Sequence, residues 1–318
     1  MKKKILIGYK LPKYFFSSLE SKFDIIFPEE SIFSQDDLKR LIPDCDAVIS
    51  VFGNKIPDEA LINNSRTKII SNFGAGFDNI DIQLAKENNI IVTNTPDEVT
   101  EPTAELAIGL ILSLIRKITY ADRKIRSNSE KWGVMENLGQ SLSSCKLGIL
   151  GFGKIGSSIA KKALAFNTEI YYNQRTKLPE EEERNLNVNY LDFHKLLQTC
   201  DILSVSVPLN SSTHHLLGKE EFSLMKNTAL LINTSRGPVI DENALVKALK
   251  NKEIGGAALD VFENEPNIHP ELSEIKNTIL VPHIGTATID TREKMAHKAA
   301  QNIIDYFAGK KLNHIVNP

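Results

Sequence analysis

Cysteine is scarce in this 318-residue sequence, and its three cysteines, Cys45, Cys145 and Cys200, stand far apart. No two of them have the spacing of a disulfide framework or of a structural metal site, so the sequence supports neither class of protein. We interpret them as buried free thiols in a reducing compartment, the cytoplasm. No metal-ligand cluster is recognisable elsewhere, and we expect no metal.

Basic stripes and long apolar runs are missing as well. The formal net charge is −2, so nothing in the composition indicates binding to nucleic acid or to a membrane surface. No apolar run reaches the length of a membrane span. The start, MKKKILIGYK, has a basic head, but its apolar run stops after Ile7, which fits a first strand better than a signal peptide.

The composition is that of a globular protein, with 42% hydrophobic and 25% charged residues. A chain of 318 residues is too long for one ordinary core, so we expect two domains. Strands and helices alternate along the whole chain, which predicts an α/β fold. The first hundred residues resemble a flavodoxin-like domain, and the later ones a doubly wound parallel sheet. Both would be Rossmann-like.

The segment KLGILGFGKIG has the pattern of a dinucleotide-binding turn. A short apolar strand precedes Gly151, Gly153 and Gly156, which have G-x-G-x-x-G spacing, and a helix is predicted over Ile155–Phe166. In this context Gly151 permits a tight turn, Gly153 lets a pyrophosphate approach the backbone, and Gly156 lets the helix pack against the strand. The phosphates would face the free N–H groups at the start of the helix.

The apolar periodicity places the remaining elements. In the first domain we expect five strands, at Ile5–Gly8, Phe23–Phe27, Ala47–Val51, Lys68–Asn72 and Ile90–Asn94. Helices are expected between them at Lys13–Glu20, Gln35–Leu41 (with Ser34 as N-cap), Pro57–Asn63 and Asp81–Asn88. The second sheet is expected to add five strands to the one before the glycines, at Glu169–Asn173, Ile202–Val207, Ala229–Asn233, Gly256–Val261 and Thr278–Val281.

Two longer helices complete the prediction. One is expected over Glu101–Ser127, apolar nearly all round in its first half, and an amphipathic one over Asp290–Ala308. Because the second sheet starts near residue 100 and ends near 284, the final helix is free to pack on the first domain. We therefore predict a discontinuous substrate-binding domain, 1–99 with 286–318, and an NAD(P)-binding domain, 100–285.

Polar residues follow neighbouring strands of the second sheet, where the carboxyl ends of parallel strands meet at one rim. Arg236 follows one strand, Asp260 and the glutamates Glu263 and Glu265 follow the next, and His283 follows the last. Of seven histidines, His283 is the one for which this position favours a function. Position alone does not decide which glutamate is its partner.

Several of these segments resemble the signatures of the D-isomer-specific 2-hydroxyacid dehydrogenases, in particular the glyoxylate/hydroxypyruvate reductases. They are NTSRGPVIDENALVKAL, ALDVFENEP, LVPHIGTAT, SNFGAGFDNID and TPDEVTEPTAELAIGL. The resemblance implies a two-domain oxidoreductase, usually a homodimer, with its active site in a cleft. It also implies that Arg236 holds the substrate carboxylate and keto oxygen, that Glu265 pairs with His283, and that His283 is the acid/base. One departure, Ser144-Cys145 in place of a structural glycine-lysine pair, leaves these roles untouched.

The glycine-containing strand ends at Val51–Gly53 and Asn72–Gly76 match the family's substrate loops, where converging N–H groups bind an anion. We therefore expect substrate contacts from Val51, Phe52, Gly53, Gly74, Ala75, Gly76, Arg236 and His283. The expected dinucleotide contacts are Gly151, Gly153, Lys154, Ile155, Gly156, Arg175, Thr176, Lys177, Pro208, Thr213, Thr234, Ser235, Arg236, Asp260, His283 and Gly285.

The end of the second strand of this sheet indicates the cofactor. An NAD site wants an acid there, about 20 residues after the glycines. The sequence instead has Arg175, Thr176 and Lys177, which favour a 2′-phosphate. We expect NADPH to be preferred, with NADH as the alternative. The single tryptophan, Trp132, lies in a polar loop, and we expect it at a subunit interface because a large aromatic must find burial.

The resulting hypothesis is an NADPH-dependent reductase of a small 2-keto acid, with glyoxylate or hydroxypyruvate as substrate. A related D-lactate or 3-phosphoglycerate dehydrogenase is the first alternative. The latter would want basic residues on the substrate loop, and Val51–Gly53 has none. A dinucleotide-sensing binding protein, like the co-repressors of this fold, is the second alternative. Such proteins usually carry long tails, whereas this chain ends almost at the fold.

Overall fold

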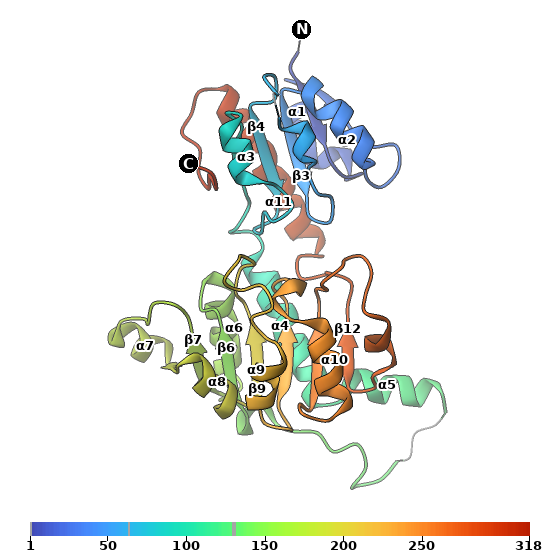
Figure 1. Cartoon of the computed structure of the whole chain (residues 1–318), viewed down its shortest axis with the longest axis vertical. Coiled ribbons are helices and arrows are strands. Elements are labelled where there is room, and N and C mark those ends of the chain that lie inside the picture. The colour runs from blue at the N-terminus through green and yellow to red at the C-terminus, as the bar shows by residue number, and fades with distance from the viewer. Residues whose placement is uncertain (1, 63, 129–131) are drawn as a thin grey trace. The chain divides into compact units, whose positions relative to one another are not determined.

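A computed structural model describes residues 2–62, 64–128 and 132–318 of the protein (Figure 1). The chain forms two compact units, one of Met1–Val99 with Ala287–Pro318 and the other of Thr100–Thr286. Within the described residues, each unit contains one sheet in which all neighbouring strands are parallel. The predicted fold class, two α/β parallel sheets, is confirmed.

The sheet of the first unit has the strand order β2-β1-β3-β4-β5 among the described residues. Its two central strands are buried along their whole length, which explains why they are nearly continuous apolar runs. The strands are β1 (Lys4–Ile7), β2 (Asp24–Ile26), β3 (Ala47–Val51), β4 (Ile69–Phe73) and β5 (Ile91–Thr93). The helices between them are α1 (Ser17–Glu20), α2 (Gln35–Leu41) and α3 (Ile82–Glu87).

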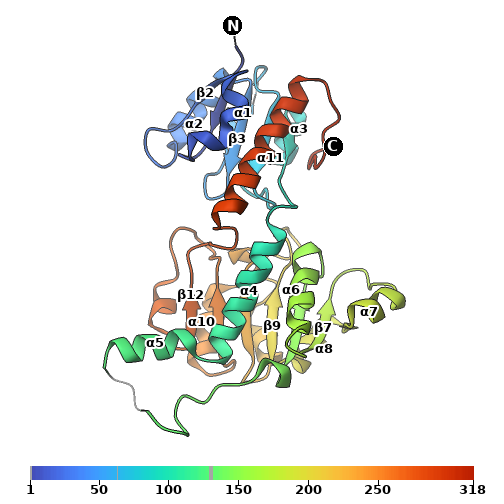
Figure 2. The ribbon, with the colours of Figure 1, turned by 180° about the vertical axis from the view of Figure 1, so that it is seen from behind.

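The last helix, α11 (Ile289–Phe307), packs on β4 and β3 of this sheet (Figure 2). Asn302, buried in that contact, donates from Nδ2 to the hydroxyls of Ser71 (3.3 Å) and Thr93 (3.2 Å). These bonds tie the end of the chain to its beginning across 231 residues. A polar side chain is tolerated in this apolar layer because its hydrogen-bond donors are satisfied.

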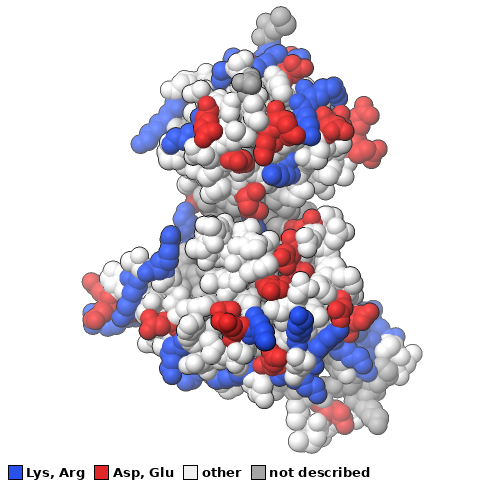
Figure 3. Space-filling view, viewed as in Figure 1, with Lys and Arg blue, Asp and Glu red and all other residues white. Residues whose placement is uncertain are grey.

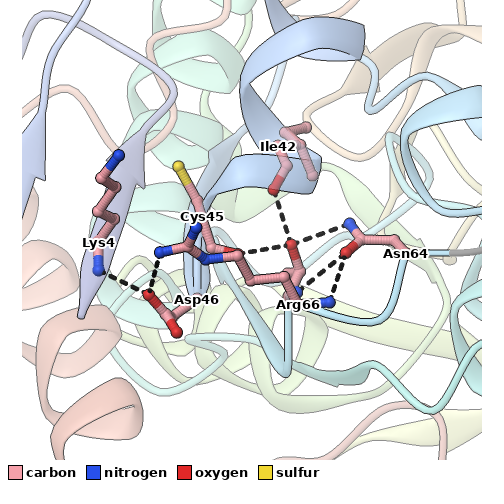
Figure 4. Close-up of polar contacts among 7 residues, drawn as sticks. Lys4, Ile42, Cys45, Asp46, Asn64 and Arg66 are labelled. Carbon is pink, nitrogen blue, oxygen red and sulfur yellow. Dashed lines mark hydrogen bonds and ion pairs between the residues drawn. The ribbon is translucent and has the colours of Figure 1, made fainter.

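A polar network fastens the amino ends of the same strands (Figure 4). Asp46, just before β3, accepts hydrogen bonds from the backbone N–H of Lys4 (2.8 Å) and from Nη2 of Arg66 (3.3 Å). The hydroxyl of Thr67 lies 3.0 Å from the carbonyl oxygen of Cys45. These contacts join the segments that lead into β1, β3 and β4, so the loops at the opposite, carboxyl ends start from fixed positions.

The sheet of the second unit has the order β12-β11-β10-β9-β6-β7-β8 in the described part of the chain. Its strands are β6 (Lys146–Leu150), β7 (Glu169–Asn173), β8 (Asn189–Tyr190), β9 (Ile202–Val205), β10 (Leu230–Asn233), β11 (Gly256–Leu259) and β12 (Thr278–Leu280). The helices are α4 (Thr100–Ile115), α5 (Ile118–Arg126), α6 (Lys154–Leu164), α7 (Glu180–Leu186), α8 (Phe193–Thr199), α9 (Lys219–Leu224) and α10 (Glu242–Lys250).

Helices cover both faces of this sheet. α4 and α6 lie on one face (Figure 2), and α8, α9 and α10 on the other (Figure 1). Side chains alternate between the two hydrophobic cores along each strand, as the pleat requires. In β10, for example, Leu231 belongs to one core and Ile232 to the other, and both are fully buried.

The long helix predicted over Glu101–Ser127 is wrong in one respect, because it is two helices. α4 ends at Ile115, and Lys117 has a left-handed φ of 56°. The carbonyl oxygen of Ile115 accepts from the N–H of Gln140 (3.0 Å), which belongs to the returning loop. A Cβ on Gly139 would lie 2.3 Å from that same oxygen. The loop therefore crosses the end of α4 and takes the carbonyl that would have continued the helix.

Two smaller predictions also differ. The helix expected over Pro57–Asn63 is a single 3₁₀ turn at Asp58–Ala60, and residue 63 lies outside the described residues. The second sheet has seven strands in the described chain rather than six, because the acid-rich α7 and the two-residue β8 were not predicted. A two-residue strand leaves no alternating pattern from which a sequence could indicate it.

Charges and thiols complete the description. Lys, Arg, Asp and Glu are interspersed over the face shown in Figure 3. The three cysteines are free and buried, and burial raises the pKa of Cys45 to about 11 and of Cys200 to about 12. Among the described residues, no helix combines the length and apolarity that a bilayer crossing requires. No group of three metal-ligating side chains is present there either.

Candidate active site

The glycine turn between β6 and α6 is built so that two of its positions admit no side chain. Gly151 has a φ of 93°, donates its N–H to the carbonyl of Asn173 (2.9 Å), and would place a Cβ 2.7 Å from the backbone of Ser206. A Cβ on Gly156 would lie 2.2 Å from the carbonyl oxygen of Gly151. Glycine at both positions therefore lets the helix start directly against the strand.

Gly153 differs from its two neighbours because a Cβ there would meet no heavy atom of the described chain within 4 Å. It is the N-cap of α6, no side chain caps that helix, and its first turn has no acid. The space beside Gly153 at the start of α6 is thus open, and the positive end of the helix dipole lies behind it. Such a cradle suits a phosphate.

Buried hydroxyls line the edge of the sheet next to this turn. Within the described residues, Ser204, Ser206 and Thr234 have side-chain oxygens that are inaccessible to water and have no hydrogen-bond partner. Ser204 lies within β9, Ser206 directly follows that strand, and Thr234 directly follows β10. An unsatisfied buried hydroxyl costs about 1–3 kcal/mol. A polar ligand on this edge would satisfy groups that the protein leaves unpaired.

The end of β7 presents cations. Arg175, Thr176 and Lys177 are exposed and begin two residues after the strand ends at Asn173. Arg175 has no ion pair among the described residues, whereas Lys177 lies 3.3 Å from Glu183 of α7. Because α7 was not predicted, this partial neutralisation of Lys177 was not foreseen. Of the two cations, Arg175 keeps the more open surroundings.

The loop after β9 is closed on itself. The hydroxyl of Thr213 donates to the carbonyl of Pro208 (2.6 Å) and accepts from the N–H of Asn210 (2.9 Å). Pro208 and Thr213, both predicted dinucleotide contacts, therefore hold each other in one compact turn at the carboxyl edge. Their contact with a dinucleotide stays a prediction.

His283 and Glu265 meet at the same edge of the sheet. Nδ1 of His283 lies 2.8 Å from Oε2 of Glu265, and Oε1 of Glu265 accepts from the N–H of Phe262 (3.0 Å). Burial by itself would raise the pKa of Glu265, but the hydrogen bond and charge of His283 outweigh it, and the pKa lies below its usual value. Glu265 is therefore a carboxylate that orients the ring of His283.

Asp260 holds the loop that carries His283. Its two carboxylate oxygens accept from the N–H groups of Ile284 (2.6 Å) and Gly285 (2.8 Å), and its own carbonyl accepts from the N–H of His283 (2.9 Å). Asp260 is 1% exposed, and burial raises its pKa although these N–H groups act in the opposite direction. The structure thus places Asp260 and Gly285 in a backbone support for His283.

Arg236 stands on a loop whose shape is set by Asn233 at the end of β10. Oδ1 of Asn233 accepts from the N–H (3.0 Å) and hydroxyl (2.8 Å) of Ser235, and its Nδ2 donates to the carbonyl of Arg236 (3.0 Å). A Cβ on Gly237 would lie 1.9 Å from the backbone of Phe262. Arg236 is therefore carried on backbone that touches the loop of Glu265, and its charge contributes to the lowered pKa of Glu265.

Glu263, the competing glutamate of the sequence, has a different partner. Its Oε1 lies 2.7 Å from Nε2 of His215. The structure therefore pairs Glu265 with His283, both of which the sequence predicted as site residues. Glu263 instead contacts His215, a histidine to which the sequence had assigned no role.

The two predicted substrate loops belong to the first unit, and Asn72 shapes both. Its Oδ1 accepts from the hydroxyl of Ser50 (2.8 Å) and from Nδ2 of Asn79 (3.2 Å), and its Nδ2 donates to the carbonyl of Gly76 (2.7 Å). Gly53, with a φ of 76°, ends the neighbouring loop. Asn72 is buried, so the loop is fixed from inside the sheet.

Arg292, from the start of α11, was also missed by sequence reasoning. Its guanidinium lies 5.0 Å from the ring centroid of Phe52 and 5.9 Å from that of Phe73. Distances of this kind are cation–π contacts. The loop that contains Phe52 is therefore braced by a residue far away in the sequence, and the only available signal, a charge in the first turn of a helix, is too common to single it out.

The predicted interface residue, Trp132, is 86% exposed in the single chain. Its neighbours Val134, Met135 and Leu138 are 94%, 76% and 55% exposed. Next to this segment, at the amino ends of β10 to β12, lies a cavity of about 580 Å³ lined in part by residues 137–140. The cavity is at the opposite end of the sheet from His283, so it does not mark the candidate active site.

A family model described as the NAD binding domain of D-isomer specific 2-hydroxyacid dehydrogenases matches residues 108–285. The chain belongs to this family. A glyoxylate reductase of Thermococcus litoralis is 41% identical over 323 residues, which cover 100% of this chain and 97% of that protein. A putative 2-hydroxyacid dehydrogenase of Staphylococcus epidermidis is 39% identical and covers 99% of both chains.

Solved structures are similar over the whole chain as well. An NADPH-dependent glyoxylate/hydroxypyruvate reductase of Sinorhizobium meliloti, in complex with NADP and malonate, has a TM-score of 0.86 and 31% identity. The similar region covers 100% of this chain and 98% of the reductase chain. The family expected from the sequence, and its likeness to glyoxylate reductases, are confirmed.

The dehydrogenase is an oxidoreductase with a nicotinamide dinucleotide as cofactor, and its second unit fits that cofactor. The cradle at Gly153 has room for a pyrophosphate, and the unpaired hydroxyls of Ser206 and Thr234 lie on the edge where doubly wound sheets bind their ligands. This edge contains the point where the strand order reverses, between β6 and β9.

The glycines of this dehydrogenase yield a direct test of the cradle. In Gly153→Ala the added methyl enters open space at an ordinary φ of −79°, so the unfolding temperature should stay unchanged. Dinucleotide affinity, measured by fluorescence titration, should fall about tenfold because the pyrophosphate loses its closest approach. Gly156→Ala should instead destabilise the fold by about 1–3 kcal/mol through its clash with Gly151. Undiminished binding in Gly153→Ala would contradict this site.

Proposed function

We propose that the dehydrogenase reduces a small 2-keto acid, glyoxylate or hydroxypyruvate, to the D-2-hydroxy acid with NADPH, and that His283 is the general acid. The observation that carries the proposal is the contact of 2.8 Å between Nδ1 of His283 and Oε2 of Glu265. The glyoxylate reductases among the relatives support the choice of substrate. The solved structure with NADP supports the choice of cofactor.

The proposed reaction uses three side chains of the second unit. The bound dinucleotide supplies the hydride that adds to the keto carbon. Arg236 binds the substrate carboxylate with its planar fork and polarises the carbonyl. With Nδ1 directed at Glu265, the other ring nitrogen of His283, Nε2, gives its proton to the carbonyl oxygen. Glu265 remains ionised throughout and stabilises the imidazolium before the transfer.

We assign the remaining contacts to the loops of each unit. Backbone N–H groups of Val51–Gly53 and Gly74–Gly76 would bind the substrate carboxylate, because both loops are held in fixed shapes by buried polar groups. In this assignment the first unit, with its final helix, is the substrate-binding domain. The N–H groups at the start of α6 would hold the pyrophosphate, and Arg175 with Thr176 a 2′-phosphate.

We also propose that the enzyme is a cytoplasmic homodimer. Trp132, Val134 and Met135 are neighbouring apolar side chains that are exposed in the single chain. Such a surface is typical of a protein–protein interface. The neighbouring cavity along residues 137–140 would be covered by the same partner. Three free buried thiols suit a reducing compartment.

Substrate and cofactor preference are tested together. Consumption of NADPH and NADH is followed by absorbance with a panel that includes glyoxylate, hydroxypyruvate, pyruvate and a phosphorylated keto acid. We expect kcat/KM to be highest for the first two, and higher with NADPH. Arg175→Ala should lower the NADPH/NADH ratio about tenfold, whereas Lys177→Ala, already paired with Glu183, should lower it less. An equal or higher kcat/KM with NADH in the wild type would refute the NADPH preference.

The catalytic pair has its own signature. His283→Ala should lower kcat about 10²–10⁴-fold while NADPH affinity is retained. Glu265→Gln removes the charge that favours the imidazolium, so the alkaline limb of the kcat profile for reduction should move to lower pH. Glu263→Gln is the matched control and should leave that limb in place. The reverse pattern in the two glutamine variants would assign the role to Glu263.

The homodimer is tested by light scattering at micromolar concentration, where we expect twice the mass of one chain. Trp132→Ser should raise the dimer dissociation constant at least about tenfold, because large aromatics dominate interface energies. Tyr14→Ser, which removes another exposed aromatic side chain, in the first unit, serves as control. A wild-type monomer would end this proposal.

A further inference from the structure

A second histidine–carboxylate pair lies beside the catalytic loops and has no place in the reaction described above. His215, in the loop after β9, directs Nε2 to Oε1 of Glu263 at 2.7 Å. Its backbone N–H donates to the carbonyl of Pro238 at 2.8 Å. Pro238 follows Arg236 in the loop after β10, and Glu263 precedes Glu265 in the loop after β11. One histidine thus ties three strand-end loops together.

Glu263 in turn exchanges hydrogen bonds with Glu242, at the start of α10. The N–H of Glu263 donates to Oε1 of Glu242 (2.7 Å), and the N–H of Glu242 to Oε2 of Glu263 (3.4 Å). Glu242 is 4% exposed, and its pKa is raised by burial first and by the charge of Glu263 as well. Two carboxyl groups therefore share one site, and the ring of His215 contacts one of them directly.

This cluster, His215 with Glu263 and Glu242, supports the catalytic residues through the backbone. Phe262, next to Glu263, donates its N–H to Glu265 (3.0 Å). The same backbone leaves no room for a Cβ on Gly237, beside Arg236. A displacement of Glu263 would therefore move Glu265, the partner of His283. It would also move Arg236, which precedes Gly237.

We propose that His215 is a positioning residue for the reduction: by pairing with Glu263 it holds the loops of Arg236 and Glu265 in place and thereby sets the affinity for the keto acid. The proposal rests on the proposed function, since it uses the roles given there to Arg236 and Glu265. It differs from that function in predicting an effect on substrate KM rather than on proton transfer.

The hydrogen bond of His215 to Glu263 is the contact that carries the proposal. Without it, the carboxylate of Glu263 loses a partner while it stays beside Glu242. The charged and titratable groups that bear on the cluster are His214, stacked on His215 at 4.0 Å between ring centroids, together with Glu242, Glu263, Glu265, His269 and Arg236.

Four variants separate these contributions in the intact enzyme. His215→Ala removes the ring and its hydrogen bond, His215→Gln retains an amide donor, and Glu263→Gln removes the acid. His214→Gln alters the neighbouring ring only. We expect His215→Ala to raise KM for the keto acid about tenfold with NADPH affinity and unfolding temperature unchanged. His215→Gln, which keeps a hydrogen-bond donor, should recover most of the keto-acid affinity.

The alkaline limb of kcat, which belongs to His283 and Glu265, should stay in place in all His215 variants, and His214→Gln should behave as the wild type. A KM in His215→Ala equal to that of the wild type, or a KM in His215→Gln as high as that in His215→Ala, would overturn the proposal. If His215→Ala lowers the unfolding temperature, Glu263→Gln takes its place and should also raise KM. Calorimetric binding of oxamate, a keto-acid analogue, to the NADPH complex tests the same affinity without turnover. Oxamate affinity should fall in His215→Ala and recover in His215→Gln, whereas an absence of keto-acid reduction by the wild type would count against the proposed function only.

Discussion

The carboxylate of Asp260 accepts hydrogen bonds from the N–H groups of Ile284 (2.6 Å) and Gly285 (2.8 Å), and the placement of His283 depends on these two bonds. They are possible because β11 and β12 are adjacent and in register, with Leu259 beside Leu280. His283 has a left-handed φ of 53°. This conformation costs free energy and persists only where the surrounding structure enforces it. The buried carboxylate provides that enforcement, and the ring then meets Glu265.

The same arrangement recurs at the other polar loops of the protein. Asn233 shapes the loop of Arg236, and Asn72 shapes a proposed substrate loop in the first unit. Each is a short polar side chain at the end of a buried parallel strand, and each bonds backbone groups of the loop that follows. Because both faces of such a sheet are covered by helices, the strand ends are the places where polar groups remain accessible to a ligand.

Much of this site was predictable because its signals are local. The glycine spacing after an apolar strand predicted the turn at Gly151, and strand-end positions singled out Arg236 and His283. The break at Lys117 could not be predicted in this way, since it arises where a returning loop takes the carbonyl of Ile115. The contact of Arg292 with Phe52 was equally hidden, because it joins segments far apart in the sequence.

The sequence by itself determined the fold class, the family and the chemistry of the side chains at the strand ends, since periodicity and motif spacing are carried by neighbouring residues. Only the tertiary structure decided how those side chains pair. Glu263 and Glu265 lie on one loop with the same functional group, and only the resemblance to the family, not their position, favoured Glu265. Glu265 faces His283 while Glu263 faces His215, because the N–H of Phe262 and the side chain of Glu242 hold the backbone of that loop in one conformation.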